Sequence, residues 1–104
     1  MRRGVLELCV LSMISREATY PSDLIRQLKD MDMIVVEGTL YPLMTRLKNE
    51  GFLNYSWEES PVGPPRKIYQ ITETGLSFLN GLLDTWSDLV HTVKQSTKNI
   101  HHNE

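Results

Sequence analysis

One set of polar side chains in this sequence is spaced for contact with a nucleic acid. The segment Glu37–Glu50 carries apolar residues at helical spacing: Leu40, Leu43, Met44 and Leu47. The other side of this expected helix carries Thr39, Tyr41, Pro42, Thr45, Arg46 and Lys48. An α-helix fits the major groove of B-DNA, where hydroxyl groups can meet base edges and cations can meet phosphates. The competing interpretation is an ordinary solvated helix face.

A second set follows a rigid Pro64-Pro65 pair, where Arg66 and Lys67 are adjacent. Two cations fixed near the tip of a hairpin can contact phosphates or the minor groove. Alternatively, they offset Glu58 and Glu59 across the hairpin. Both interpretations can hold, because strand alternation directs neighbouring side chains to opposite faces. We therefore count Arg66 and Lys67 among the candidate DNA contacts.

Other chemistry is poorly supported by the residue types present. Cys9 is the single cysteine, so the sequence predicts no internal disulfide and no cysteine-based zinc site, and a reducing, cytoplasmic setting fits best. His91, His101 and His102 lack the spacing of metal ligands, and the adjacent Glu58 and Glu59 diverge on a strand. No phosphate-binding loop or nucleophile motif occurs. We expect no enzyme, no cofactor and no metal site.

The composition limits how DNA could be bound. The chain has 104 residues and a formal net charge of -2, which suits one small domain without a global basic field. The segment Glu37–Ile71 contains four cations and four carboxylates, so non-specific affinity should be modest. No apolar run approaches the ~20 residues that span a bilayer, so no membrane partner is expected.

The elements that must position these residues follow from the spacing of apolar residues and from the Pro, Gly and Asp residues that begin or end helices. Arg3–Ser15 is expected to form a helix that is apolar almost all round and must be covered on two sides. A second helix starts at Pro21-Ser22-Asp23, and Met33–Val36 is a connector with strand potential. Gly51 suits the C-terminal cap of the helix at Glu37–Glu50. Pro42 conflicts with that helix unless it begins near Gly38 or Thr39, which would bring this proline close to the first turn.

From Phe52 the apolar period changes to two. Leu53, Tyr55 and Trp57 alternate with polar residues, which predicts a half-buried strand paired with Lys67–Ile71. Thr72 can cap a last helix whose apolar stripe is long: Leu76, Leu79, Leu82, Leu83, Trp86, Leu89, Val90 and Val93. After Lys94 the chain is polar and is expected to fray.

This order predicts an α+β, mostly α fold: a winged helix-turn-helix of three helices and a two-stranded wing over residues 1–71, then a long C-terminal dimerisation helix and polar tail over 72–104. Three stretches sharpen the prediction: GTLYPLMTRL at Gly38–Leu47, EGFL at Glu50–Leu53 and GPPRKIYQIT at Gly63–Thr72. Together they resemble the PadR family of transcriptional regulators, in its small class with one C-terminal helix. The chain departs from the family pattern at Pro21-Ser22-Asp23, where a glycine and an aromatic residue are more usual.

The resemblance implies a transcriptional repressor. The long stripe is wider than the small winged domain can cover, which predicts a homodimer and hence a palindromic promoter operator in double-stranded DNA. Trp86 lies in the middle of this stripe, and the resemblance implies that it could bind a planar hydrophobic or aromatic effector. The residues assigned to this interface are Trp86, Leu83, Val90, Met13 and Cys9.

Two alternatives stay open. Trp86 could serve only to pack the dimer, leaving a DNA-binding regulator without an effector. The acidic balance and the neutral DNA-facing segment are compatible with a different class of function, a winged-helix protein-interaction module without DNA binding. Salt-dependent duplex binding separates these classes, and loss of about one unit of salt slope per protomer on replacing Arg46 or Lys67 would identify a phosphate contact.

Overall fold

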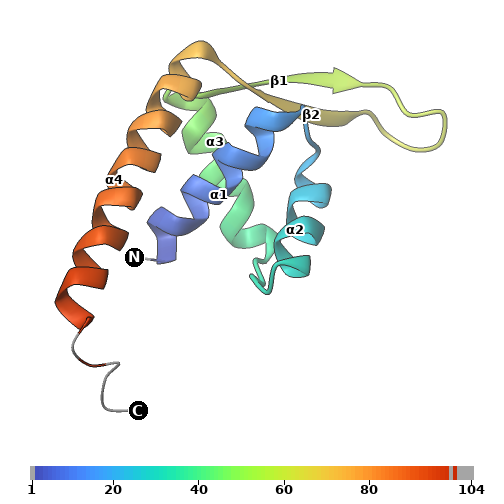
Figure 1. Ribbon diagram of the computed structural model, residues 1–104. Coiled ribbons are helices and arrows are strands. Elements are labelled where there is room, and N and C mark those ends of the chain that lie inside the picture. Colours follow the sequence, from blue (N-terminus) through green and yellow to red (C-terminus); the bar gives the residue numbers. More distant parts are fainter. Residues whose placement is uncertain (1, 99, 101–104) are drawn as a thin grey trace.

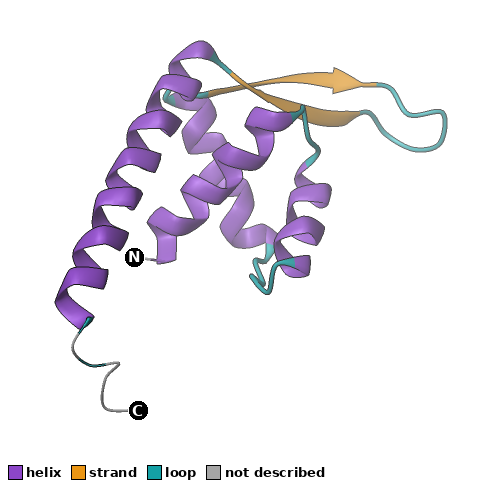
Figure 2. Ribbon diagram, in the orientation of Figure 1, coloured by secondary structure: helices purple, strands orange, loops and turns teal. Residues whose placement is uncertain are grey.

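Four helices and one antiparallel hairpin make up the fold (Figures 1 and 2). In the computed structural model, which describes residues 2–98 and 100, the elements are α1 (Arg2–Arg16), α2 (Pro21–Asp30), α3 (Glu37–Asn49), β1 (Leu53–Glu58), β2 (Arg66–Ile71) and α4 (Glu73–Thr97). Helices α1 to α3 and the β1–β2 wing form the compact part, and α4 runs along one side of it. The predicted fold class, a winged helix-turn-helix with a long last helix, is confirmed.

Helix α1 lies at the centre of the core. Its Val10, Leu11 and Ile14 are buried, and the fully enclosed side chains of the other elements pack around them: Leu24, Leu28, Leu40, Met44, Leu47 and Leu53. α4 covers another side of α1 (Figure 1). The expected cover on two sides is therefore present, and burial of these aliphatic side chains is the main force that assembles the three helices.

Helix α2 begins at Pro21, as the sequence predicts. Tyr20 occupies the N-cap position without a side-chain cap, and Asp23 lies in the first turn, where a carboxylate is favourable. The connector after α2 contains no strand, which corrects the expectation for Met33–Val36. Val35 is buried in the core, so the connector is held by its side chain and not by strand pairing.

Helix α3 ends in a glycine cap. Gly51 has a φ of 85°, its N–H donates to the Lys48 carbonyl at 3.0 Å, and the N–H of Phe52 donates to the Leu47 carbonyl at 2.9 Å. This is the Schellman arrangement, which needs a left-handed residue and so favours glycine. α3 begins at Glu37, earlier than the start that would favour Pro42, so the proline lies in the second turn. Because proline has no backbone N–H, the carbonyl of Gly38 lacks its usual helical donor four residues later.

The wing pairs Leu53 with Ile71 and Glu58 with Arg66 in antiparallel register. Leu53 is buried and Tyr55 is half-buried, but Trp57 is 61% exposed, which corrects the expected half-buried face at this position. Toward the end of β1 the hairpin extends beyond the helices (Figure 1), so no buried core lies under the last residues of the strand. An isolated bridge between Thr19 and Tyr69, which the sequence did not predict, joins the chain before α2 to the wing.

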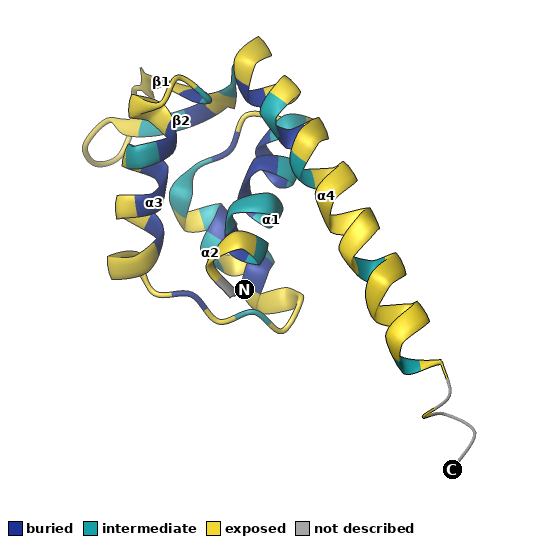
Figure 3. Cartoon of the chain, turned by 90° about the vertical axis from the view of Figure 1, so that its left-hand side faces the viewer, coloured by how far each residue is buried: buried dark blue, intermediate teal, exposed yellow. Residues whose placement is uncertain are grey.

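Helix α4 is capped by Thr72, whose hydroxyl accepts from the Gly75 N–H at 2.9 Å, as predicted. Of its described residues only Gly75 and Leu79 are buried, and its C-terminal half extends away from the compact part (Figure 3). The helix continues to Thr97, past the expected end at Lys94. The expected fraying after Lys94 is therefore wrong for residues 95–97, which are helical. Residues 99 and 101–104 of that tail, with His101 and His102 among them, lie outside the described residues.

Candidate nucleic-acid interface

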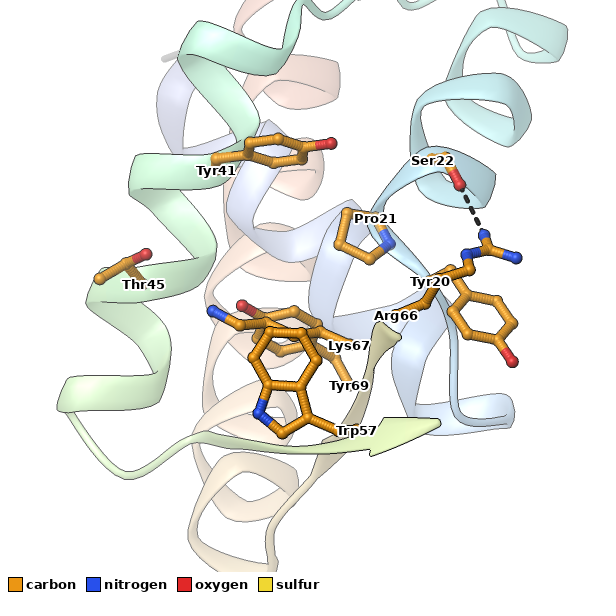
Figure 4. Close-up of a pocket in the computed structure, with 9 residues that line it drawn as sticks. All are labelled: Tyr20, Pro21, Ser22, Tyr41, Thr45, Trp57, Arg66, Lys67 and Tyr69. Carbon is orange, nitrogen blue, oxygen red and sulfur yellow. Dashed lines mark hydrogen bonds between the residues drawn. The ribbon is translucent and has the colours of Figure 1, made fainter. Parts of the chain in front are cut away.

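A cleft of about 340 Å³ separates α3, the start of α2 and the wing (Figure 4). It is lined by Tyr20, Pro21, Ser22, Tyr41, Thr45, Trp57, Arg66, Lys67 and Tyr69. Tyr41 and Thr45 come from the exposed side of α3, one helical turn apart. The fold thus brings four of the predicted contacts, Tyr41, Thr45, Arg66 and Lys67, to one concave face.

Lys67 is held by aromatic rings. Its Nζ lies 4.4 Å from the ring centroid of Tyr55 and 5.4 Å from that of Trp57, its register partner on β1. Such cation–π contacts hold an ammonium group in place while leaving its N–H donors free on the open side. Lys67 can therefore present a fixed positive charge in the cleft.

Arg66 points toward α2. Its guanidinium carbon lies 3.8 Å from the ring centroid of Tyr20, and its Nη2 donates to the Ser22 hydroxyl at 3.0 Å (Figure 4). The Tyr20 hydroxyl in turn donates to a carboxylate oxygen of Glu58, and this hydrogen bond raises the pKa of the Tyr20 phenol above its ordinary value. Among the described residues no ion pair joins Arg66 or Lys67 to Glu58 or Glu59, so the alternative of a cross-hairpin charge pair is not realised as a direct contact.

Of the remaining predicted contacts, Thr39, Pro42 and Arg46 lie along the other edge of α3, whereas Lys48 lies toward the wing. Thr39, Pro42 and Arg46 line a larger apolar groove toward α1, and the Nζ of Lys48 lies 5.8 Å from the Tyr55 ring centroid. Arg46 is bound by two carboxylates, at 3.3 Å to Glu7 and 2.9 Å to Glu50. The hydrogen bond with Glu50 is the main cause that raises the pKa of the Arg46 guanidinium. Its charge is consequently offset within the protein.

Five cleft residues were missing from the sequence prediction: Tyr20, Pro21, Ser22, Trp57 and Tyr69. Tyr20, Pro21 and Ser22 lie outside α3 and the wing, and the single-residue bridge at Thr19 that brings them to the wing leaves no periodic pattern. Trp57 could have been found from the strand register, which places it opposite Lys67. The apolar alternation assigns Trp57 to the half-buried face of the strand instead.

The residues assigned to an effector or dimer interface do not all lie together. Trp86 lines a pocket of about 180 Å³ between α1 and α4, together with Gly4, Val5, Leu8, Leu82, Thr85 and Leu89. Met13 is buried in the core instead, and half-buried Cys9 packs against that core. Leu83 is exposed and Val90 is half-buried on α4. Residues of the first turns of α1 thus take the place expected for Met13 and Cys9.

The described part of the chain offers neither a metal site nor a membrane-spanning helix. Residues 2–98 and 100 contain no group of three or more histidine, cysteine or acidic residues arranged to hold a metal ion. No helix among them is long and apolar enough to cross a membrane.

Three core helices, a two-stranded wing beside α3 and an exposed polar face between them define a DNA-binding protein of the winged helix-turn-helix class. The model of the transcriptional regulator PadR-like family matches residues 10–80. The chain belongs to this family of transcriptional regulators, which bind DNA and are not enzymes.

Solved structures agree with this assignment. The chain is 52% identical to a PadR-like transcription factor from Bacteroides fragilis, with a TM-score of 0.83 and coverage of 91% of this chain and 92% of that one. A PadR family regulator from Eggerthella lenta is 37% identical, with a TM-score of 0.83 and coverage of 90% and 82%. A PadR-like regulator from Bacillus cereus is 36% identical, with a TM-score of 0.77 and coverage of 88% and 90%.

Proposed function

We propose that the protein is a homodimeric repressor that binds a palindromic promoter operator in the cytoplasm through residues 1–71. The observation that carries this proposal is the cleft of Figure 4, in which the exposed face of α3 and two wing cations line one concavity. In a groove-bound pose Thr39, Tyr41, Pro42 and Thr45 of α3 would face base edges and sugars. Lys48, Arg66 and Lys67 would face phosphates, with Arg46 at the α1 edge of the same helix.

The exposed stripe of α4 supports dimerisation through residues 72–104. Large apolar side chains recur on one side of the helix and stay between 40% and 51% exposed in the single chain: Leu76, Leu83, Trp86, Leu89 and Val93. A stripe of this length favours a second copy as the partner, because a two-fold axis would cover both stripes at once. Two recognition helices related by that axis would read two half-sites about one helical turn apart, or a multiple of that spacing.

Trp86 supports the effector part of the proposal. Its ring is 40% exposed and lines the small pocket between α1 and α4, so a planar hydrophobic molecule could stack on it. Since α4 would carry the dimer axis, a ligand there can change the separation of the two recognition helices. A purely structural Trp86 would instead leave its fluorescence unchanged across a panel of planar aromatic compounds.

The test is binding of the purified protein to a labelled duplex from its own upstream promoter region, scanned over salt with excess competitor DNA. If two or three cations per protomer contact phosphates, the slope of log K against log salt should be on the order of -4 to -5. Lys67→Ala should reduce the magnitude of this slope by about one for each protomer. Exposed Lys94 on α4 offers a matched control, and Lys94→Ala should leave the slope unchanged.

Two results would count against the proposal. A folded dimer that binds no duplex at low salt would favour the protein-interaction module. Equal slopes for the wild type and Lys67→Ala would remove the wing from the DNA interface.

A further inference from the structure

One side of the wing is fastened to the start of α2 through Tyr20. The Tyr20 ring lies under the Arg66 guanidinium at 3.8 Å, and its hydroxyl donates to Glu58. Glu58 and Arg66 are opposite each other in the β1–β2 register. A single phenol therefore contacts both strands at the last residue pair of the β1–β2 register.

Tyr20 itself is fixed by its neighbours along the chain. Thr19 donates its backbone N–H to the Tyr69 carbonyl at 3.0 Å and accepts from the Tyr69 N–H at 2.9 Å, so the residue before Tyr20 is tied to the wing backbone. Tyr20 then serves as the N-cap residue of α2, although its side chain makes no capping hydrogen bond. Its ring is thus left to contact the wing, in a position set by two elements.

The consequence for Arg66 is a restricted but still available guanidinium. The ring contact at 3.8 Å and the 3.0 Å hydrogen bond to the Ser22 hydroxyl together restrict the orientation of the group. An arginine side chain has five N–H donors, of which this bond uses one. The others can still meet a phosphate, and ordering before binding removes part of the entropy cost of association.

We propose that Tyr20 is a positioning residue, which holds the Arg66 guanidinium ready to bind a phosphate of the DNA backbone at the α2 side of the cleft. This inference rests on the proposed function, because it assumes that the cleft faces a duplex. It adds a residue outside the recognition helix and the wing to the DNA-binding machinery, acting through Arg66 and not by contact with DNA. Lys67, held by different rings, should be independent of it.

A double-mutant cycle tests the proposal in the full chain, with the upstream duplex as the probe. Tyr20→Leu removes the aromatic face and the hydroxyl, and should weaken binding roughly three- to tenfold for each protomer that contacts the duplex. In an Arg66→Ala background the same change should have less than about a twofold effect, because the group that Tyr20 orders is gone. In a Lys67→Ala background its full effect should persist.

Tyr20→Phe is the matched control, since it keeps the ring under Arg66 and removes only the hydrogen bond to Glu58. It should bind within about twofold of the wild type if stacking is the ordering contact. Nuclear magnetic relaxation of the Arg66 Nε–H group in the free protein gives a second readout that needs no DNA. Arg66 should be ordered in the wild type and in Tyr20→Phe, and mobile in Tyr20→Leu.

The outcomes are distinguishable. If the wild type binds the duplex but Tyr20→Leu weakens binding equally with and without Arg66, Tyr20 has only a structural role and this inference is overturned. Unchanged Arg66 mobility in Tyr20→Leu overturns it as well. If the folded wild type binds no duplex, the proposed function fails first, and ordering of Arg66 then has no role in DNA binding.

Discussion

Arg46 of α3 and Glu7 of α1 form an ion pair, with Nη2 and Oε1 3.3 Å apart. The same guanidinium contacts Glu50 at 2.9 Å, so a cation expected to meet DNA is bound by carboxylates from two elements. Glu7 is only 15% exposed, which makes this pair less screened than an ordinary surface ion pair. Arg46 therefore joins α3 to α1 in addition to any contact that it makes with DNA.

Replacing Arg46 by alanine should lower the free energy of unfolding by about 1 kcal/mol, because Glu7 would keep its charge without this partner. The double variant Glu7→Gln/Arg46→Ala should recover most of that loss. Urea denaturation of the wild type, both single variants and the double variant measures the interaction. Additive losses in this cycle would mean that the pair contributes nothing measurable.

The same pairing predicts a graded effect on DNA binding. Arg46→Ala should reduce the salt slope by less than Lys67→Ala does, since the charge of Arg46 is already offset by Glu7 and Glu50. Parallel salt titrations of the two variants on one duplex give the comparison. A larger change for Arg46→Ala would show that the arginine leaves its carboxylates to bind a phosphate.

Gly75 and Gly81 on α4 form a second matched pair. A Cβ at Gly75 would collide with the Phe52 carbonyl oxygen and approach Cγ1 of Ile71 to 2.8 Å, whereas one at Gly81 would meet nothing within 4 Å. Gly75→Ala should therefore destabilise the protein by about 1–3 kcal/mol through overpacking. Gly81→Ala should stabilise it by about 0.5–1 kcal/mol through helix propensity. Thermal unfolding of both variants checks the signs, and two equal shifts would contradict the close approach at Gly75.

Local signals in the sequence were sufficient for most of the fold. Pro21, Gly51 and Thr72 each mark a helix end through the conformation or hydrogen bond that the residue type favours, and the structure has all three ends there. Apolar spacing identified the buried face of α3 for the same reason, because burial in a helix follows a fixed period.

The errors concern contacts between distant segments. Alternation assigns Trp57 to a face of the strand but does not reveal whether another element covers that face. The partner of Arg46 on α1 is 39 residues away in sequence, and the Thr19–Tyr69 bridge involves a single residue on one side. Such features arise only when the helices pack. Polar residues of α3 and the two wing cations were therefore predictable, while Tyr20, Pro21 and Ser22 were not.

The stripe on α4 gives a prediction for assembly. Leu83 is 43% exposed in the single chain, and Leu83→Asp would place a carboxylate in the proposed dimer interface. The dimerisation free energy should fall by about 3 kcal/mol or more, because a buried charge without a partner is costly. Sedimentation over a range of concentrations measures the change. Ser77→Asp, exposed and away from the stripe, is the control and should leave the dimer intact. Unaltered sedimentation of Leu83→Asp would remove α4 from the interface.

Tyr69 predicts a loss of stability at alkaline pH. It is 5% exposed, and burial is the main cause that raises its pKa above the ordinary value of 10.0. A raised pKa in the folded state means that folding favours the neutral phenol, so this contribution is fully present below pH 10 and is lost as the pH rises through the folded-state pKa. Urea denaturation from about pH 9 to about pH 11 should show that the free energy of unfolding falls as the pH rises.

The Tyr69→Phe variant has no ionisable group at this position, so its free energy of unfolding should fall less steeply with pH. Tyr20→Phe is the control for the second tyrosine with a raised pKa. Identical slopes for the wild type and Tyr69→Phe would mean that Tyr69 ionises as readily in the folded protein as in the unfolded chain.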